Sequence, residues 1–300
     1  MLHILTHDIL PVFSMLALGF LLGRAGTISR EEAAAVNRVA FLVLQPALIF
    51  PLIAAVDFGA FALDAMAAYA LSQAVAFGLA YGLAKRVFGR AAIEAWLLAM
   101  AVVFVNSLLY IWPISVLLYG SGNNMPITAL VAWDASVTFA FFIISTDLMA
   151  NRGAGSAKAL KRVAMNPVLV AIAAGVLANL SAVEVPQPVL TAAQFAGAGA
   201  APLTLLALGV ILSGQKIAPG PVVLAISGMK LLVFPAFVWV ALSQTTAPDN
   251  WVSLVHLNAA GPSGAMAFAL AMLYRVRTDA IAPVIIWTSL LSLISLAALA

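Results

Sequence analysis

Apolar residues along this chain are grouped into ten long stretches separated by short polar connections. A membrane-spanning helix needs about 20 mostly apolar residues to cross roughly 30 Å of hydrocarbon, and the stretches are close to or above this length. We therefore predict an all-α polytopic membrane protein with ten transmembrane helices, at residues 8–23, 39–56, 65–84, 92–119, 127–149, 164–181, 189–213, 221–243, 251–274 and 279–299.

Basic residues occupy only alternate connections between these stretches. Cytoplasmic loops are enriched in Lys and Arg, so the odd-numbered connections are expected to face the cytoplasm. Both termini then lie on the outer side of a bacterial cytoplasmic (inner) membrane, and the first stretch is expected to be an N-out helix rather than a cleavable signal peptide. Thirteen of the 14 Lys and Arg follow this rule, namely Arg24, Arg30, Arg38, Lys85, Arg86, Arg90, Arg152, Lys158, Lys161, Arg162, Lys216, Arg275 and Arg277.

Composition narrows the class of protein further. The chain is 64% hydrophobic and only 8% charged, whereas a soluble domain carries about 25% charged residues. The net charge of +3 is then a topology signal and not a nucleic-acid-binding surface. Cysteine is absent and the three histidines show no metal-ligand spacing. We expect no enzyme activity, no catalytic residues, no cofactor, no metal site and no nucleic-acid partner, with membrane lipid as the surroundings.

The two halves of the chain resemble each other when shifted by 156 residues. Five helices per half is an odd number, so the second half must be inserted upside down relative to the first, as in many secondary transporters. We predict a first five-helix repeat at 1–150, a cytoplasmic connector at 151–163 and a second, inverted repeat at 164–300. The coinciding pairs are Pro11 and Pro167, Gly19 and Gly175, Pro46 and Pro202, Asn106 and Pro262, and Ser107 and Ser263.

The fourth stretch of each half carries residues that interrupt a helix. Proline removes a backbone hydrogen bond and clashes with the preceding turn, and glycine lowers the cost of non-helical backbone. Such a break is tolerated inside a membrane only where it lines protein or water, and matching breaks in two halves are typical of a transporter's substrate site. The predicted substrate-binding residues are Asn106 and Pro113 in the first break and Asn258, Gly261, Pro262 and Ser263 in the second.

The chemistry of these breaks favours an anion. Both are expected near the middle of the membrane, and the helix that restarts after a break presents N-terminal amides that attract negative charge. The side chains of Asn106 and Asn258 can add amide donors. The pattern predicts a small carboxylate as substrate. The alternative is that these residues only kink the helices and form no binding site.

Two ionisable residues lie within predicted transmembrane helices. From their positions, Lys230 is about 14 Å deep from the cytoplasmic side and Asp134 about 10 Å deep from outside, which makes their levels differ by roughly 6 Å in a 30 Å core. They are interpreted either as a charge or coupling site or as a structural ion pair, and Lys230 could instead face the substrate carboxylate. Gln45 and Gln73 are expected to form hydrogen bonds between helices, and His256 to be a titrating or an interfacial side chain.

The chain resembles the auxin efflux carrier family, which includes plant PIN carriers and bacterial malonate and other carboxylate permeases. The resemblance rests on LPVFSMLALGFLLGRAGTIS with VNRVAFLVLQPALIF, on VPQPVLTAAQFAGAGAAPLTLLALGVIL, on Asn106 with Pro113, on GPSGAMAFALAMLY and on Lys230 with Pro235. It implies broken fourth and ninth helices that cross at the centre, a scaffold of helices 1, 2, 6 and 7, a transport domain formed by the rest, elevator-like movement and a homodimer. Ile111 and Trp112 replace a glycine usual before the first crossover proline, so that Trp112 is expected to reshape the pocket, and Leu273 replaces an acidic residue.

The sequence therefore predicts a secondary transporter of a small organic anion, with protons as the expected coupling ion. A sodium-coupled symporter of the related bile-acid type is one alternative, although the carboxylate-rich cage expected for sodium is missing around Asp134. A membrane sensor that binds the same ligand class without transporting it is the other.

Overall fold

The computed structural model describes residues 2–150, 161, 164–181, 184–215 and 217–299. Within these residues the regular structure is helical, and one isolated β-bridge is the exception. Most of the predicted connector at 151–163, including Arg152, Lys158 and Arg162, lies outside the described residues, as does Lys216.

Seven of the helices are long and apolar enough to cross a membrane, which confirms an all-α membrane protein. Three further apolar helices are shorter, at Ala92–Val103, Ser107–Tyr119 and Pro167–Leu180. The seven long ones are Leu2–Arg24, Arg30–Ala54, Leu63–Val87, Met125–Ala150, Gln187–Ser213, Pro221–Leu242 and Ile281–Leu299.

Several of the long helices contain a wider π-helical turn. The second begins as the polar helix α3 (Arg30–Val39), where Ser29 and Glu32 form a reciprocal capping box, and continues through residues 40–44 into α4 (Gln45–Ala54). The Met125–Ala150 helix consists of α8 (Met125–Trp133), a π turn at Asp134–Thr138 and α9 (Phe139–Ala150). The Pro221–Leu242 helix consists of α14 (Pro221–Gly228), a π turn at Met229–Val233 and α15 (Phe234–Leu242). π turns are rare in proteins overall, and those that occur are often found at functional sites. Asp134 and Lys230 each lie in such a turn, which makes both residues candidates for a functional role.

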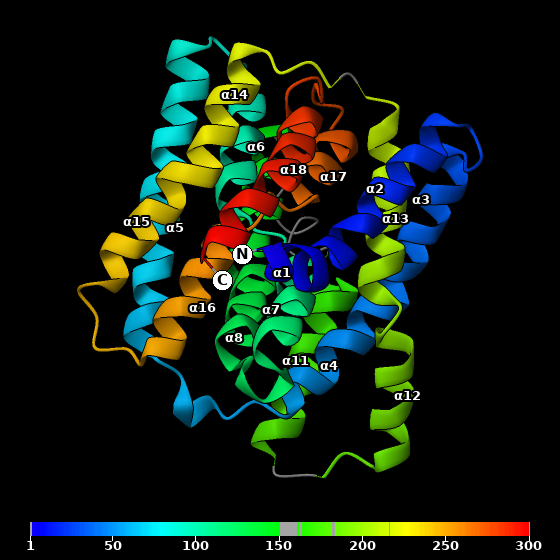
Figure 1. Cartoon of the computed structure of the whole chain (residues 1–300), viewed down its shortest axis with the longest axis vertical. Helices are drawn as coiled ribbons and strands as arrows, with labels where there is room; N and C mark the ends of the chain where they lie inside the picture. Colours follow the sequence, from blue (N-terminus) through cyan, green and yellow to red (C-terminus); the bar gives the residue numbers. More distant parts are fainter. Residues whose placement is uncertain (1, 151–160, 162–163, 182–183, 216, 300) are drawn as a thin grey trace.

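The helices form two packed groups; in Figure 1, α2, α3, α12 and α13 of the first lie on the right, and α5, α14 and α15 of the second lie on the left. In the first group α13 (Ala200–Ser213) packs on α2 (Leu10–Arg24), α3 and α4, and α4 also contacts α11 (Pro167–Leu180) and α12 (Gln187–Gly197). In the second group α6 (Ala92–Val103) packs on α5 (Leu63–Gly82), α9, α14, α17 (Met266–Leu273) and α18 (Ile281–Leu299), and α16 (Asp249–Ala259) packs on α5, α8 and α15.

Close backbone approach holds the first group together. A Cβ atom on Gly19 in α2 would overlap the backbone oxygen of Leu206 in α13, and one on Gly209 in α13 would overlap that of Leu16 in α2. Small residues at helix interfaces permit this approach, and the resulting van der Waals contact replaces the hydrophobic drive that lipid does not supply.

Loops at each end of the molecule are joined by polar contacts. At one end Arg90, before α6, lies 2.9 Å from Glu94 and 3.8 Å from Asp279, before α18. At the other end the Asp64 carboxylate accepts hydrogen bonds from the backbone N–H and the hydroxyl of Thr246 at 2.8 and 3.1 Å. The first contact joins the third predicted connection to the residue that directly follows the ninth. The second contact joins the second and eighth connections, so odd connections lie with odd ones and even with even.

Candidate substrate-binding site

Helix α6 ends at Val103, and Phe104, Val105 and Asn106 are non-helical. The chain becomes helical again in a π turn at Ser107–Ile111, followed by α7 (Trp112–Tyr119). Pro113 is the second residue of α7, after the interruption, so it does not cause the break. The predicted break at Asn106 and Pro113 therefore overlaps the observed interruption at Asn106 only.

The second interruption separates α16, which ends at Ala259, from α17, which begins at Met266. Pro262 lies at its centre, between Gly261 and Ser263, where the missing N–H of proline and the lack of a Cβ on glycine are compatible with non-helical backbone.

The two interruptions satisfy each other's backbone groups. Val105 and Ser263 form an antiparallel bridge, the Gly264 N–H donates to the Phe104 oxygen at 2.7 Å, and the Asn106 N–H donates to the Pro262 oxygen at 3.1 Å. A Cβ on Gly264 would lie 2.8 Å from the Phe104 ring, so this approach requires glycine. Because unpaired backbone groups cost several kcal/mol in hydrocarbon, this mutual pairing makes a double interruption tolerable inside the membrane.

A cavity of about 850 Å³ lies beside the paired interruptions, between the two groups of helices. This volume is in the range of small-molecule sites. The first group contributes Asn37, Arg38, Phe41, Gln45, Thr204, Leu205 and Leu208; the second contributes Phe104, Asn106, Ser107, Leu108, Asp134, Phe139, Gly264, Ala265 and Met266, among others.

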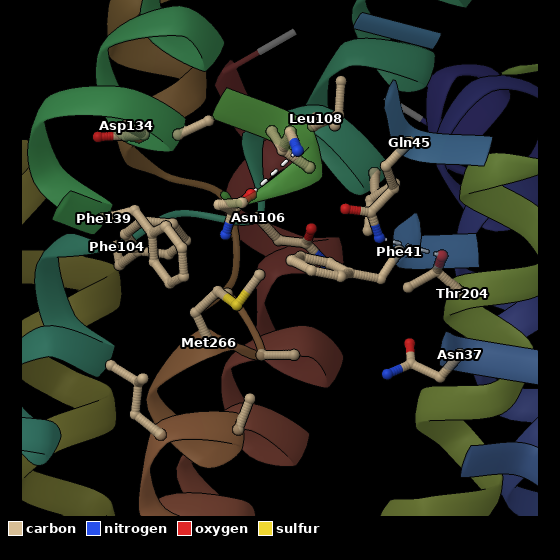
Figure 2. Close-up of a pocket in the computed structure, with 18 of the residues that line it drawn as sticks. Asn37, Phe41, Gln45, Phe104, Asn106, Leu108, Asp134, Phe139, Thr204 and Met266 are labelled. Atoms are coloured by element: carbon tan, nitrogen blue, oxygen red, sulfur yellow. Dashed lines mark hydrogen bonds between the residues drawn. The ribbon is translucent and has the colours of Figure 1, made fainter. Parts of the chain in front are cut away.

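Asn106 is the polar side chain of the first interruption that remains available to a ligand. It is part-buried and lines the cavity, and Figure 2 draws no hydrogen bond at its amide nitrogen. Ser107, Leu108 and Leu109, at the start of the following helix, also line the cavity. The first amides of a helix lack an intrahelical acceptor and carry partial positive charge, so this wall is suited to a carboxylate.

The opposite wall carries a second pair of neutral polar groups. The Gln45 amide donates to the Thr204 hydroxyl at 3.4 Å, which confirms that Gln45 forms a hydrogen bond between helices. Both residues also line the cavity. In Figure 2 the Phe41 ring extends from this wall toward Asn106, opposite the rings of Phe104 and Phe139. A ligand here would meet neutral donors and apolar surface.

Asp134 lines the cavity but its carboxylate is directed into the protein, as Figure 2 shows. One carboxylate oxygen accepts from Tyr69 at 3.1 Å and from Ser107 at 3.3 Å, and the other accepts from Gln73 at 2.8 Å and Thr138 at 3.2 Å. Four donors thus surround a buried carboxylate, and one of them, Ser107, belongs to the helix that follows the first interruption.

Lys230 is fully buried and is absent from the cavity wall. Its ammonium group donates to the Ala259 oxygen at 2.7 Å, at the last residue of α16, and lies 4.9 Å from the centre of the Phe234 ring. The described residues contain no ion pair within 4.0 Å between Lys230 and Asp134, so the direct pair considered from sequence is not formed. Contact between Lys230 and a ligand in the cavity is likewise not available in this arrangement.

The remaining predicted site residues lie behind the cavity wall. Asn258 and Ser263 are buried, and Pro113, Gly261 and Pro262 are also absent from the wall. The Ser263 hydroxyl donates to the Ala101 oxygen at 2.6 Å, and the Asn258 amide donates to the Tyr69 hydroxyl at 3.2 Å. Of the eight predicted residues the structure therefore places Asn106 and Asp134 on the wall, while the second interruption contributes Gly264, Ala265 and Met266.

Sequence reasoning missed Tyr69, whose hydroxyl joins Asn258 of one interrupted helix to Asp134. The spacing of the two residues could have indicated this role, because Tyr69 lies four residues before Gln73 and therefore on the same face of α5. Gln73 was expected to bond between helices, and it does so with Asp134, the Val103 oxygen and Trp133.

Trp112, expected to reshape the pocket, is absent from its wall. Ile111 instead fills the space beside Gly261, where an added Cβ would lie 2.5 Å from the end of the Ile111 side chain. Gly261 in the second interruption thus leaves room for the Ile111 side chain.

Acidic and histidine side chains do not gather around the cavity. Among the described residues there is no group of three or more His, Cys, Asp or Glu that could hold a metal ion. The geometry instead combines a membrane-embedded cavity, paired helix interruptions and neutral donors.

Comparison with known proteins agrees with this geometry. The profile of a family described as "Membrane transport protein" matches residues 153–300. An "Uncharacterized transporter" of Methanothermobacter thermautotrophicus is 26% identical over 302 residues, covering 97% of this chain and 96% of the relative. A "Putative malonate transporter" of Rhizobium meliloti is 25% identical over 299 residues, covering 96% of this chain and 92% of the relative.

The all-helical membrane fold and these relatives define the chain as a membrane transporter. Within that class, residues 153–300 match the family described as "Membrane transport protein", in keeping with the resemblance of its motifs to the auxin efflux carrier family.

Proposed function

We propose that this protein is a secondary active transporter that moves a small carboxylate across the bacterial cytoplasmic membrane. The observation that carries the proposal is the Asn106 amide nitrogen, which donates to no described residue and lines a cavity of about 850 Å³ at the start of an interrupted helix. The name of the Rhizobium relative supports malonate as the first compound to test.

The transport mechanism we propose is elevator-like alternating access within ten membrane crossings. The seven long helices would be joined by the Pro167–Leu180 helix and by two crossings built from the interrupted pairs α6–α7 and α16–α17. The halves 1–150 and 164–300 would be inverted repeats joined by the connector at 151–163. The cytoplasmic side would hold the odd-numbered connections, and both termini would lie outside.

The two packed groups of helices are suited to such movement. The group containing α2, α4, α11 and α13 would be the scaffold and form the homodimer contact, and the group containing the two interruptions would carry the substrate. The cavity lies between them, so sliding one group past the other would change the side to which Asn106 is open. Asn258, Gly261, Pro262, Ser263 and Pro113 would then shape the backbone of the site or reach the substrate in another position of the cycle.

Charge coupling is assigned to Asp134 and Lys230. Asp134 contacts the first interruption through Ser107, and Lys230 contacts the end of α16 before the second. A proton taken up or lost at either residue would alter a contact to the substrate-bearing segment. We propose protons as the coupling ion; replacing sodium with choline should leave transport unchanged, and loss of transport would favour the sodium-coupled alternative.

The test is uptake of radiolabelled malonate into proteoliposomes by the purified wild type and by Asn106→Ala. Removal of a neutral donor that binds a charged ligand should lower transport efficiency at least tenfold, corresponding to roughly 1.5–3 kcal/mol. Asn123→Ala is the matched control, because Asn123 is exposed and its side chain donates a hydrogen bond to the Tyr119 oxygen on the surface.

Equal kinetics in wild type and Asn106→Ala would reject the assigned site. Saturable malonate binding without flux would favour the sensor interpretation. If malonate fails, the same assay with mono- and dicarboxylates of increasing size tests the wider class.

A further inference from the structure

Two basic side chains, Arg38 and Lys161, line the same cavity as Asn106. Both are exposed, and neither has an acidic partner within 4.0 Å among the described residues. The acidic residue on the wall is Asp134, whose carboxylate already accepts four hydrogen bonds inside the protein. The charge that the described wall offers to a ligand is therefore positive.

Arg38 lies at a different depth from the Asn106 site. It precedes Gln45 by seven residues on a continuous helix, a rise of about 10 Å. Figure 2 shows Gln45 and Phe41 near Asn106, whereas Asn37, the neighbour of Arg38, lies farther along the wall. Arg38 is exposed and Asn106 is part-buried, so the cationic groups mark the open end of the cavity and the amide its inner end.

The other arginines of the same connection do not share this arrangement. Arg24 packs over the Phe20 ring at 5.5 Å, and Arg30 lies beside Gly214 at the end of α13. Neither lines the cavity. The positive-inside rule requires basic residues in the connection but not that one of them should face the cavity, so the placement of Arg38 calls for a separate explanation.

We propose that Arg38, assisted by Lys161, forms a capture site at the cavity mouth that binds organic anions before they reach Asn106 and favours dianions over monoanions. The proposal rests on the proposed function for the identity of the anion. Clefts lined by one sign of charge raise the local concentration of oppositely charged ligands and the association rate by 10- to 1000-fold, in a manner that depends on salt. A guanidinium group can hold a carboxylate in two hydrogen bonds, and then release it when solvent competes.

Cysteine chemistry tests the charge of the mouth without any knowledge of the substrate. The chain has no native cysteine, so Asn37→Cys creates a single thiol on the wall next to Arg38. Its reaction rate is measured with two methanethiosulfonate reagents of similar size, one sulfonated and anionic, the other trimethylammonium and cationic. Adding Arg38→Gln should lower the anionic-to-cationic rate ratio about tenfold at low salt and much less at 1 M salt, where the screening length falls to about 3 Å.

Arg24→Gln in the Asn37→Cys background is the matched control, since it removes an equal charge from the same connection without touching the cavity. Arg38→Lys should retain most of the ratio. A ratio that is unaffected by Arg38→Gln, or that falls equally in the Arg24→Gln control, would overturn the capture site.

Binding of malonate and of malonamate, which has the same shape but one negative charge fewer, then tests the selectivity. Arg38→Gln should weaken malonate binding by about tenfold and malonamate binding by about threefold at low salt. Equal losses for both compounds would contradict the preference for dianions. If neither compound binds the wild type, the proposed substrate is wrong, while the thiol reaction rates still decide whether the cationic mouth exists.

Discussion

At the scale of single residues, the buried charges complete the ends of interrupted helices. The Asp134 carboxylate contacts Ser107 at the beginning of one helix, and the Lys230 ammonium contacts the Ala259 oxygen at the end of another. Helix beginnings carry partial positive charge and helix ends partial negative charge, so each side chain complements the end that it contacts. Asn106 differs because it lines the cavity and its amide nitrogen donates to no described residue.

Tyr69→Phe tests whether the link between Asn258 and Asp134 stabilises the fold. The change removes one donor to Asp134 and the acceptor of the Asn258 amide, whose oxygen already lacks a partner. We expect the free energy of unfolding to fall by about 1–3 kcal/mol, which should appear as a lower melting temperature in intrinsic tryptophan fluorescence. Tyr119→Phe, at an exposed position, should melt like the wild type, and equal melting of both variants would contradict the stabilising role.

At the scale of elements, the first group of helices depends on glycines that permit backbone contact. Gly209→Ala would push its Cβ into the backbone oxygen of Leu16, a rigid neighbour that cannot rotate away. Overpacking of this kind costs about 1–3 kcal/mol, so we expect a lower yield of folded protein and a lower melting temperature.

Gly78→Ala is the control for that substitution. Gly78 lies on an exposed face of α5, and a Cβ there would meet nothing within 4 Å. Since alanine is the better helix former, Gly78→Ala should melt at or above the wild-type temperature. Equal melting temperatures for the Gly209→Ala and Gly78→Ala variants would contradict the prediction, because the α2–α13 contact would then tolerate an extra carbon atom.

Hydrophobic length predicts the long helices well, because crossing the membrane is a local requirement on about 20 residues. The position of the first interruption could not be predicted from Pro113, since the break occurs where Val105 pairs with Ser263 in the other half of the chain. The partners of Asp134 and Lys230 depend on the same distant packing. Asn106 was found because an amide in an apolar stretch is conspicuous, whereas Arg38 was counted only as a topology signal.

At the scale of the whole molecule, polar contacts join loops that should lie on one side of the membrane. Arg90 meets Asp279, and Asp64 meets Thr246, in agreement with the alternation of basic connections. If the interrupted pair crosses the membrane as we propose, the connection before α6 and the connection after α7 lie on opposite sides.

Single-cysteine labelling tests this topology in intact cells. Val87→Cys, which is 70% exposed before α6, should react with a membrane-impermeant maleimide only after the cells are permeabilised. Asn123→Cys, exposed after α7, should react without permeabilisation. Reaction of both thiols from the same side would exclude a complete crossing by residues 92–119.

The bridge between Val105 and Ser263 also has a consequence for biosynthesis. The backbone groups at Phe104 and Asn106 find their partners on a segment that the ribosome makes about 160 residues later. At 5–20 residues per second, this leaves a delay of roughly 10–30 seconds during which the early segment must rely on water, lipid headgroups or the insertion machinery. A stop codon introduced after the first half should therefore yield a fragment that proteases remove, and co-expression of the second half should rescue it.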